Sequence, residues 1–94
     1  MRIKQSLHEI GDRLTRARDE LRIAEEQLLF QNDVLEEAKT RMLVSETPLA
    51  DQAYRIARDD HQKLVDQRLR AQNEITDLQR EQDRLLDRML GAES

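Results

Sequence analysis

The sequence of 94 residues contains no cysteine and no tryptophan, and it has only one proline, two glycines, one tyrosine and one phenylalanine. Without cysteine there is no disulfide, no thiolate nucleophile and no thiolate metal ligand. Strands favour aromatic and β-branched residues, and folds of many elements need turn residues. The scarcity of both argues against an all-β fold and against a thick globular core. We therefore predict an all-α chain built from long helices.

Long apolar runs and a strong charge of one sign are also missing. No stretch approaches the roughly 18 apolar residues that span a membrane. Residues 1–10 carry Arg2, Lys4 and Glu9 rather than the apolar core of a secretory signal, so we expect a cytoplasmic protein. The 16 Lys and Arg against 20 Asp and Glu give a formal net charge of -4, unlike a dedicated nucleic-acid binder. Most basic residues are arginine, which indicates GC-rich, bacterial-type coding.

Apolar residues recur at alternating spacings of four and three in both halves of the chain, which is the pattern of a coiled-coil seam. The first stripe consists of Ile3, Leu7, Ile10, Leu14, Ala17, Leu21, Ala24, Leu28, Gln31, Leu35, Ala38 and Met42. The second stripe consists of Ala50, Tyr54, Ala57, His61, Leu64, Arg68, Ala71, Ile75, Leu78, Gln82, Leu85 and Met89. Each stripe predicts a helix that buries one narrow face.

The only proline separates the two stripes. Pro48 is disfavoured inside a helix but suits its first position, and Thr47 before it is a good N-cap. We therefore predict helices over about 2–44 and 48–90, a turn at 45–47 within a single domain of residues 1–91, and a frayed tail over 92–94. Gly91 fits the C-terminal end of the second helix.

A single continuous rod is the alternative to a hairpin. If the first stripe is extended past Met42, it places polar residues such as Gln52 and Asp59 on the seam, so a rod would need a break in phase at its proline. When the second stripe is reversed onto the first, the pairs centre on Glu46. The pattern therefore favours an antiparallel coiled-coil hairpin with arms of about 63 Å at 1.5 Å per residue.

Two polar residues of the stripes, Gln31 and His61, fall opposite each other in the predicted pairing. Such a polar seam layer usually fixes the register of a coiled coil at a cost in stability. The alternative is a pH-sensitive position, because histidine changes charge near neutral pH. His61 also follows Asp59 and Asp60, but adjacent helical residues do not converge on a metal ion. We expect no metal site.

No arrangement of residues predicts catalysis. The serine and threonine hydroxyls lie in no nucleophile elbow and near no glycine-rich loop. Paired carboxylates such as Glu25 and Glu26 lie on solvated helix faces without a pocket that could shift their pKa values. The sequence therefore predicts no enzyme, no catalytic residue and no cofactor.

Basic residues gather in the parts of the two helices that lie far from the turn. They are Arg13, Arg16, Arg18, Arg22, Arg80, Arg84 and Arg88. Acidic residues are interleaved with them, which favours salt-bridged faces, for example Arg13 with Glu81, over a phosphate-binding stripe. An accessory nucleic-acid or ribosome-associated arm that uses this arginine-rich end remains the alternative function.

Six apolar residues lie beside the stripes on one side of the predicted hairpin, near its turn. We call this set the apolar flank: Ile23, Phe30, Val34, Leu49, Ala53 and Ile56. Isolated surface apolar residues are ordinary, but a cluster of them indicates a buried contact. We expect a non-enzymatic interaction module whose partners are a second copy, in a four-helix homodimer, another protein, or both, with no membrane contact. A smaller cluster, Leu29, Val65 and Leu69, lies on the opposite side.

Overall fold

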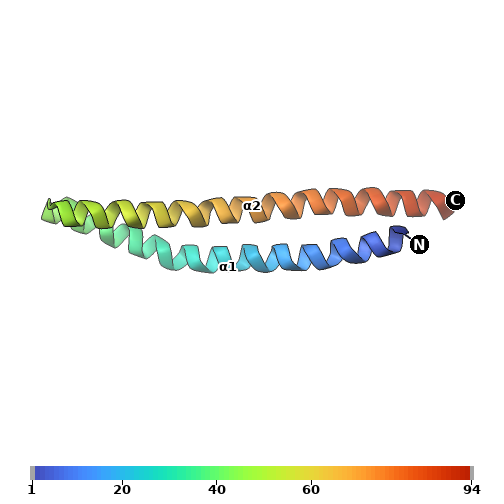
Figure 1. Ribbon diagram of the computed structural model, residues 1–94, viewed down its shortest axis with the longest axis horizontal. Helices are drawn as coiled ribbons and strands as arrows, with labels where there is room; N and C mark the ends of the chain where they lie inside the picture. Colours follow the sequence, from blue (N-terminus) through green and yellow to red (C-terminus); the bar gives the residue numbers. More distant parts are fainter. Residues whose placement is uncertain (1, 94) are drawn as a thin grey trace.

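Two long helices make up almost the whole described chain. In the computed structural model, α1 spans Arg2–Ser45 and α2 spans Pro48–Glu93. The structure describes residues 2–93, and of these only Glu46 and Thr47 lie outside a helix. The second helix turns back and runs beside the first, so the start of α1 and the end of α2 lie at the same end of the molecule (Figure 1). The predicted all-α class with two helices is confirmed.

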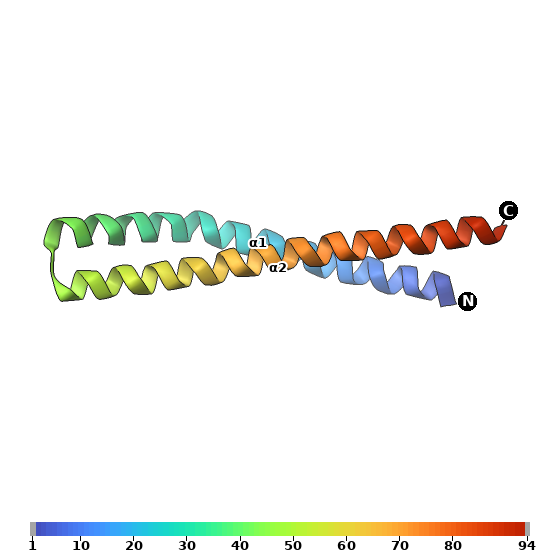
Figure 2. The same cartoon turned by 90° about the horizontal axis from the view of Figure 1, so that it is seen from above.

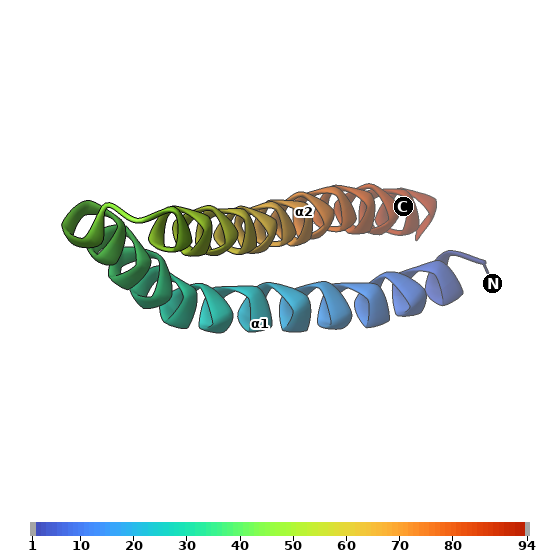
Figure 3. The same ribbon diagram turned by 60° about the vertical axis from the view of Figure 1, so that its left-hand side comes forward.

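The molecule is thin and elongated, with extents of 70 × 15 × 14 Å. The two helices lie apart at mid-length in Figure 1 but cross there in Figure 2, which shows that they wind past one another. Figure 3 shows the short connection that joins them at the far end from the termini. This shape is consistent with a helical hairpin, as the breaker at Pro48 predicts.

The turn is closed by local hydrogen bonds. Glu46 has a φ of 51°, in the left-handed region, and its N–H donates to the Met42 carbonyl at 3.2 Å. A residue in this conformation commonly ends a helix, because its N–H satisfies a carbonyl that has lost its helical partner. On the other side, the Thr47 hydroxyl accepts a hydrogen bond of 3.2 Å from the N–H of Ala50. The predicted N-cap is therefore confirmed.

Burial follows the two stripes. All twelve positions of each stripe are buried or half-buried. The buried residues all belong to the stripes and are Ile10, Leu14, Ala17, Ala24, Leu28, Ala57, Ala71, Leu78 and Leu85. Four of the five large ones, Ile10, Leu14, Leu78 and Leu85, form one cluster in the half that carries the termini. The fifth, Leu28, is buried in the half near the turn.

The helix ends differ slightly from the sequence prediction. The first helix ends at Ser45 rather than at residue 44, and the second continues to Glu93 rather than ending by residue 90. The prediction that Gly91 ends the helix is wrong: no glycine of the described residues has a positive φ, so none adopts the left-handed cap conformation. Of the expected tail, Ser94 lies outside the described residues.

Candidate functional site

Most of the apolar flank lines a single groove beside the turn. Phe30 and Val34 from α1 and Ala53 and Ile56 from α2 face the same hollow of ≈ 480 Å³. The phenylalanine and the isoleucine remain 71% and 55% exposed. The hairpin therefore brings together apolar side chains from two distant parts of the sequence and leaves the two largest, Phe30 and Ile56, exposed.

The other two flank residues extend this surface at its ends. Leu49 lies outside the groove, at the start of α2, and is 76% exposed. Ile23, which is 45% exposed, lines a separate hollow farther from the turn, of ≈ 510 Å³. The flank is therefore a band along one side of the hairpin rather than a closed pocket.

Small seam residues explain why these hollows form. Alanines line both of them: Ala24 and Ala71 in one, and Ala38, Ala50, Ala53 and Ala57 in the other. Five of these alanines belong to the stripes between the helices. A methyl group fills little of the space between two helices, so the side chains above it overhang a concave strip instead of a filled seam. A concave apolar strip of this kind fits the convex face of another helix.

Charges of both signs border the groove near the turn. Glu37 and Arg41 on α1 form an ion pair of 2.8 Å, and Asp60 lies on the α2 side. These side chains are exposed, so each pair contributes little to stability. Their mixed signs give the groove a polar rim that neither a strongly acidic nor a strongly basic ligand would match.

Exposed apolar residues also occur beside the turn itself, where the sequence reasoning did not place them. Leu43 and Val44 in the last turn of α1 are both exposed, like Leu49 across the turn. The heptad register would have identified them, because both directly follow the last position of the first stripe, Met42, and lie off that stripe. They extend the uncovered apolar surface to the tip of the hairpin.

Gln31 and His61, predicted to share one polar layer, each form a hydrogen bond with another residue. Gln31 and His61 are both half-buried in the seam. The Gln31 side-chain amide donates to the Ala57 carbonyl at 3.3 Å, while His61 Nε2 forms a hydrogen bond of 2.7 Å with Asn32 Oδ1. Each polar residue therefore bridges the two helices through its own partner. The Asn32 contact was not predicted.

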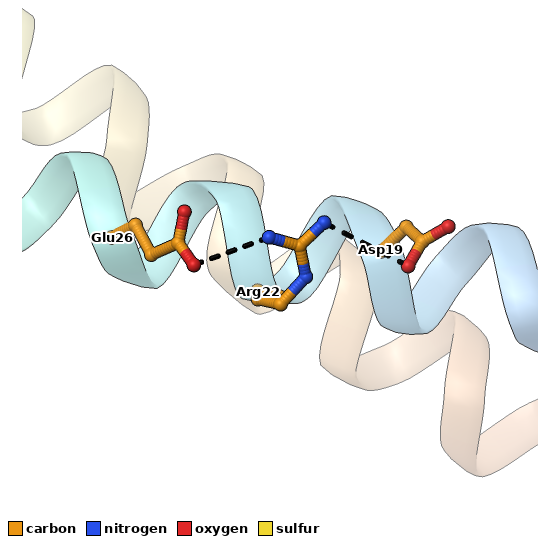
Figure 4. A network of polar contacts seen from close by, with 3 residues as sticks. All are labelled: Asp19, Arg22 and Glu26. Carbon is orange, nitrogen blue, oxygen red and sulfur yellow. Dashed lines mark hydrogen bonds and ion pairs between the residues drawn. The ribbon is translucent and has the colours of Figure 1, made fainter.

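The arginine-rich part of the hairpin contains several ion pairs within each helix. Arg22 lies between Asp19, at 3.9 Å, and Glu26, at 3.1 Å, on consecutive turns of α1 (Figure 4). On α2, Arg80 lies 3.9 Å from Asp77. Because these guanidinium groups already face carboxylates, their positive charge is partly neutralised within each helix.

The interhelical ion pair in this region differs from the predicted one. Arg13 lies 3.8 Å from Glu74, so the expected pairing with Glu81 is wrong. Glu81 instead accepts two hydrogen bonds from Arg84 of its own helix, one of them from Nε at 3.0 Å. This contact lowers the pKa of the Glu81 carboxyl and raises the pKa of the Arg84 guanidinium.

The part of the chain that the structure describes contains neither a metal-binding cluster nor a membrane-spanning helix. No three described His, Cys, Asp or Glu side chains are grouped so that they could hold a metal ion. Neither helix of the described chain contains an apolar stretch long enough to cross a membrane.

Comparisons with known proteins leave the family open. No family model matches this sequence, no curated protein matches it, and no solved structure matches it.

Proposed function

We propose that this protein is a non-enzymatic, cytoplasmic interaction module: an antiparallel coiled-coil hairpin that binds protein through its apolar flank. The observation that carries the proposal is the groove in which exposed Phe30 and Ile56 overhang a floor of alanines. Exposing large apolar side chains to water is unfavourable in free energy, and burying them against a partner protein is favourable.

The shape and charge of the surface support a protein partner. An elongated apolar strip with a polar rim resembles the grooves that accept amphipathic helices. By contrast, phosphate binding depends on unopposed cations that release counterions. Arg22, Arg41 and Arg84 each lie against a carboxylate of their own helix, so the arginines supply little unopposed charge.

The proposal is tested by substituting the flank and an equally exposed control pair. Phe30→Asp with Ile56→Asp introduces charge into the groove, and Leu29→Asp with Leu69→Asp introduces it at apolar positions that are 72% and 53% exposed. We expect the flank pair to abolish association, measured by sedimentation of the purified chain and by capture of binding proteins. The control pair should retain association.

Circular dichroism shows whether each variant is still helical. We expect both variants to be helical, because all four substituted side chains are exposed in the hairpin. The proposal is wrong if the flank pair, while still helical, associates as the wild type and the control pair do. It is equally wrong if the wild type associates with nothing, itself included.

A further inference from the structure

The side of the hairpin that carries the apolar flank is hollowed along most of its length. The groove beside the turn shares Phe30 with a hollow of ≈ 420 Å³, which in turn shares Gln27 with the hollow that Ile23 lines. Glu20 and Glu74 also line the hollow of Ile23, and both line a further hollow in the arginine-rich half. The uncovered surface is therefore continuous, and we call this run of hollows the concave strip.

The concave strip is large enough for a complete protein interface. A face of 70 by 15 Å has a footprint of about 1,050 Å², and each subunit of a standard interface buries about 800 Å². The hairpin also exposes 7341 Å² for 11.1 kDa. A compact monomer of that mass exposes about 5,700 Å², so the hairpin has an excess of about 1,600 Å². Covering the whole strip removes most of this excess, whereas covering the turn half alone removes far less.

Contacts across the seam show which residues of α1 and α2 lie at the same height in the hairpin. The Gln31 side chain bonds to Ala57, and the His61 side chain bonds to Asn32. The residue numbers in these two pairs add up to 88 and 93. Residues of the two antiparallel helices are therefore level when their numbers add up to about 90.

In the arginine-rich half, the two edges of the concave strip carry opposite charges at three successive heights. The level pairs are Arg13 with Asp77, Arg16 with Glu74, and Glu20 with Arg70. Toward the turn, the α1 edge therefore changes from positive to negative, and the α2 edge changes from negative to positive. If the α1 edge of one copy meets the α2 edge of another at equal height, opposite charges face each other at all three heights.

In the turn half, the same alignment matches apolar residues. Val34 on α1 is level with Ile56 on α2, and both line the groove. Phe30 lies one helical turn from Val34 on the α1 edge, and Ala53 lies about one turn from Ile56 on the α2 edge. A single alignment at equal height therefore brings opposite charges together and buries the apolar flank.

The two edges meet at equal height when two hairpins point in the same direction. We infer that a second copy covers the concave strip in a dimer whose two-fold axis runs along the hairpins, so that both turns lie at the same end. In this dimer α1 of each chain lies beside α2 of the other, and these neighbours run in opposite directions, as in an up-and-down four-helix bundle. The inference rests on the proposed function and names its partner, because a second copy is present wherever the chain is made.

Hairpins that point in opposite directions do not match in this way. A two-fold axis across the hairpins places α1 beside α1 and α2 beside α2. With full overlap, the turn half of each copy lies against the arginine-rich half of the other, and Phe30 of one copy lies near Arg16 of the other. An overlap of the turn halves alone leaves the charged edges uncovered. The charge pattern therefore favours the dimer with both turns at one end.

A spin label near the turn distinguishes these arrangements. The chain has no cysteine, so Ser45→Cys, at an exposed residue at the end of α1, creates a single labelling site. With both turns at one end, the two α1 helices lie diagonally across the bundle, about 14 Å apart for neighbours spaced by about 10 Å. Pulsed electron resonance at about 100 μM should therefore give a distance below about 30 Å. A longer distance, such as the roughly 65 Å of full antiparallel overlap, or no dipolar coupling overturns the inference.

Charge reversal tests whether the edges of two different copies meet. Glu20→Arg alone or Arg70→Glu alone should weaken dimerisation by about tenfold, because each places like charges opposite each other twice in the dimer. Mixing the two variants in equal amounts should restore wild-type affinity in sedimentation equilibrium, because each edge of one variant then meets an edge of opposite charge on the other. A mixture that associates no better than the separate variants overturns the inference.

This design separates contacts between copies from damage to the hairpin itself. Within each variant, positions 20 and 70 of the same chain keep like charges after mixing, so only contacts between copies can restore the affinity. Glu25→Arg is the matched control, because Glu25 is exposed and lies about 140° around α1 from Glu20. It should leave dimerisation unchanged, and a loss of affinity equal to that of Glu20→Arg overturns the assignment of the interface to the concave strip.

The two proposals fail in different ways. A wild type that is monomeric at about 100 μM, yet captures another protein that the flank pair Phe30→Asp with Ile56→Asp no longer binds, overturns the second-copy inference alone. A helical flank variant that dimerises as the wild type does overturns both proposals. A labelled dimer with the expected short distance that the flank pair converts to monomer supports both, and we expect that loss to exceed about 100-fold in affinity.

Discussion

Glu46 offers the sharpest test of the turn, because it is a non-glycine residue in a conformation that favours glycine. Its φ of 51° lies in the left-handed region, and its N–H closes the end of α1 on the Met42 carbonyl. A side chain in this region costs roughly 1–2 kcal/mol, because its Cβ crowds the following carbonyl. Glycine removes that contact but loses more chain entropy on folding, by about 0.5–1 kcal/mol.

The difference between these effects predicts that Glu46→Gly stabilises the protein by about 0.5–1 kcal/mol. For a domain of this size, that corresponds to a rise in Tm of about 2–8 °C. In a continuous rod the same residue would lie inside a helix, where glycine lowers stability by about 1 kcal/mol. The sign of the effect therefore distinguishes the hairpin from the rod.

The assay is thermal and urea unfolding followed by circular dichroism at one fixed protein concentration, since association makes Tm depend on concentration. Asp33→Gly is the control, because Asp33 is exposed and lies inside α1. We expect it to lower stability by about 0.3 kcal/mol, because aspartate is itself a weak helix former. If Glu46→Gly lowers stability as much as Asp33→Gly does, our account of the turn is refuted.

Four further substitutions test the interior and the charged surface. Gly11→Ala should raise the free energy of unfolding by about 1 kcal/mol in urea titrations, because Gly11 lies within α1 and an added Cβ would meet nothing within 4 Å; a loss of stability would contradict a helical Gly11. Leu14→Ala should lower stability by about 3 kcal/mol, because this side chain is 3% exposed in the main cluster. Leu29→Ala, at an exposed position, should change stability by less than about 0.5 kcal/mol in the same assay. Equal losses of stability for Leu14→Ala and Leu29→Ala would contradict the assignment of Leu14 to the buried seam. Arg84→Gln should raise the pKa of the Glu81 carboxyl toward its ordinary value in an NMR pH titration, because the hydrogen bonds from Arg84 lower it. The stabilisation from the Glu81–Arg84 pair is present above the ordinary pKa of the carboxyl and is lost as the pH falls through its lowered pKa. If Arg84→Gln leaves the titration of Glu81 unchanged, the contact is absent in solution.

Much of the fold could be predicted because its signals are local. The spacing of Leu14, Leu28 and their equivalents repeats with the helix, so it identifies the buried face whatever lies opposite. The Thr47–Pro48 pair starts a helix through its own hydroxyl and its fixed φ. Gly91 misled the prediction because a glycine near a helix end favours termination but does not enforce it.

The candidate site could be predicted in part. The register placed Phe30, Val34, Ala53 and Ile56 on one side, and they line one groove. The groove itself could not be foreseen from those residues alone, since it also depends on the alanines beneath them and on how closely the two helices approach.

What the sequence alone determined is the division into two helices and the face that each one buries, because backbone periodicity and capping act within a few residues. Only the tertiary structure decided which charged and polar groups meet across the seam. Arg13 contacts Glu74 rather than Glu81, which lies one heptad, or about 10 Å, further along α2. Several acidic residues repeat at heptad spacing, so the partner depends on how the two helices are offset along their common axis.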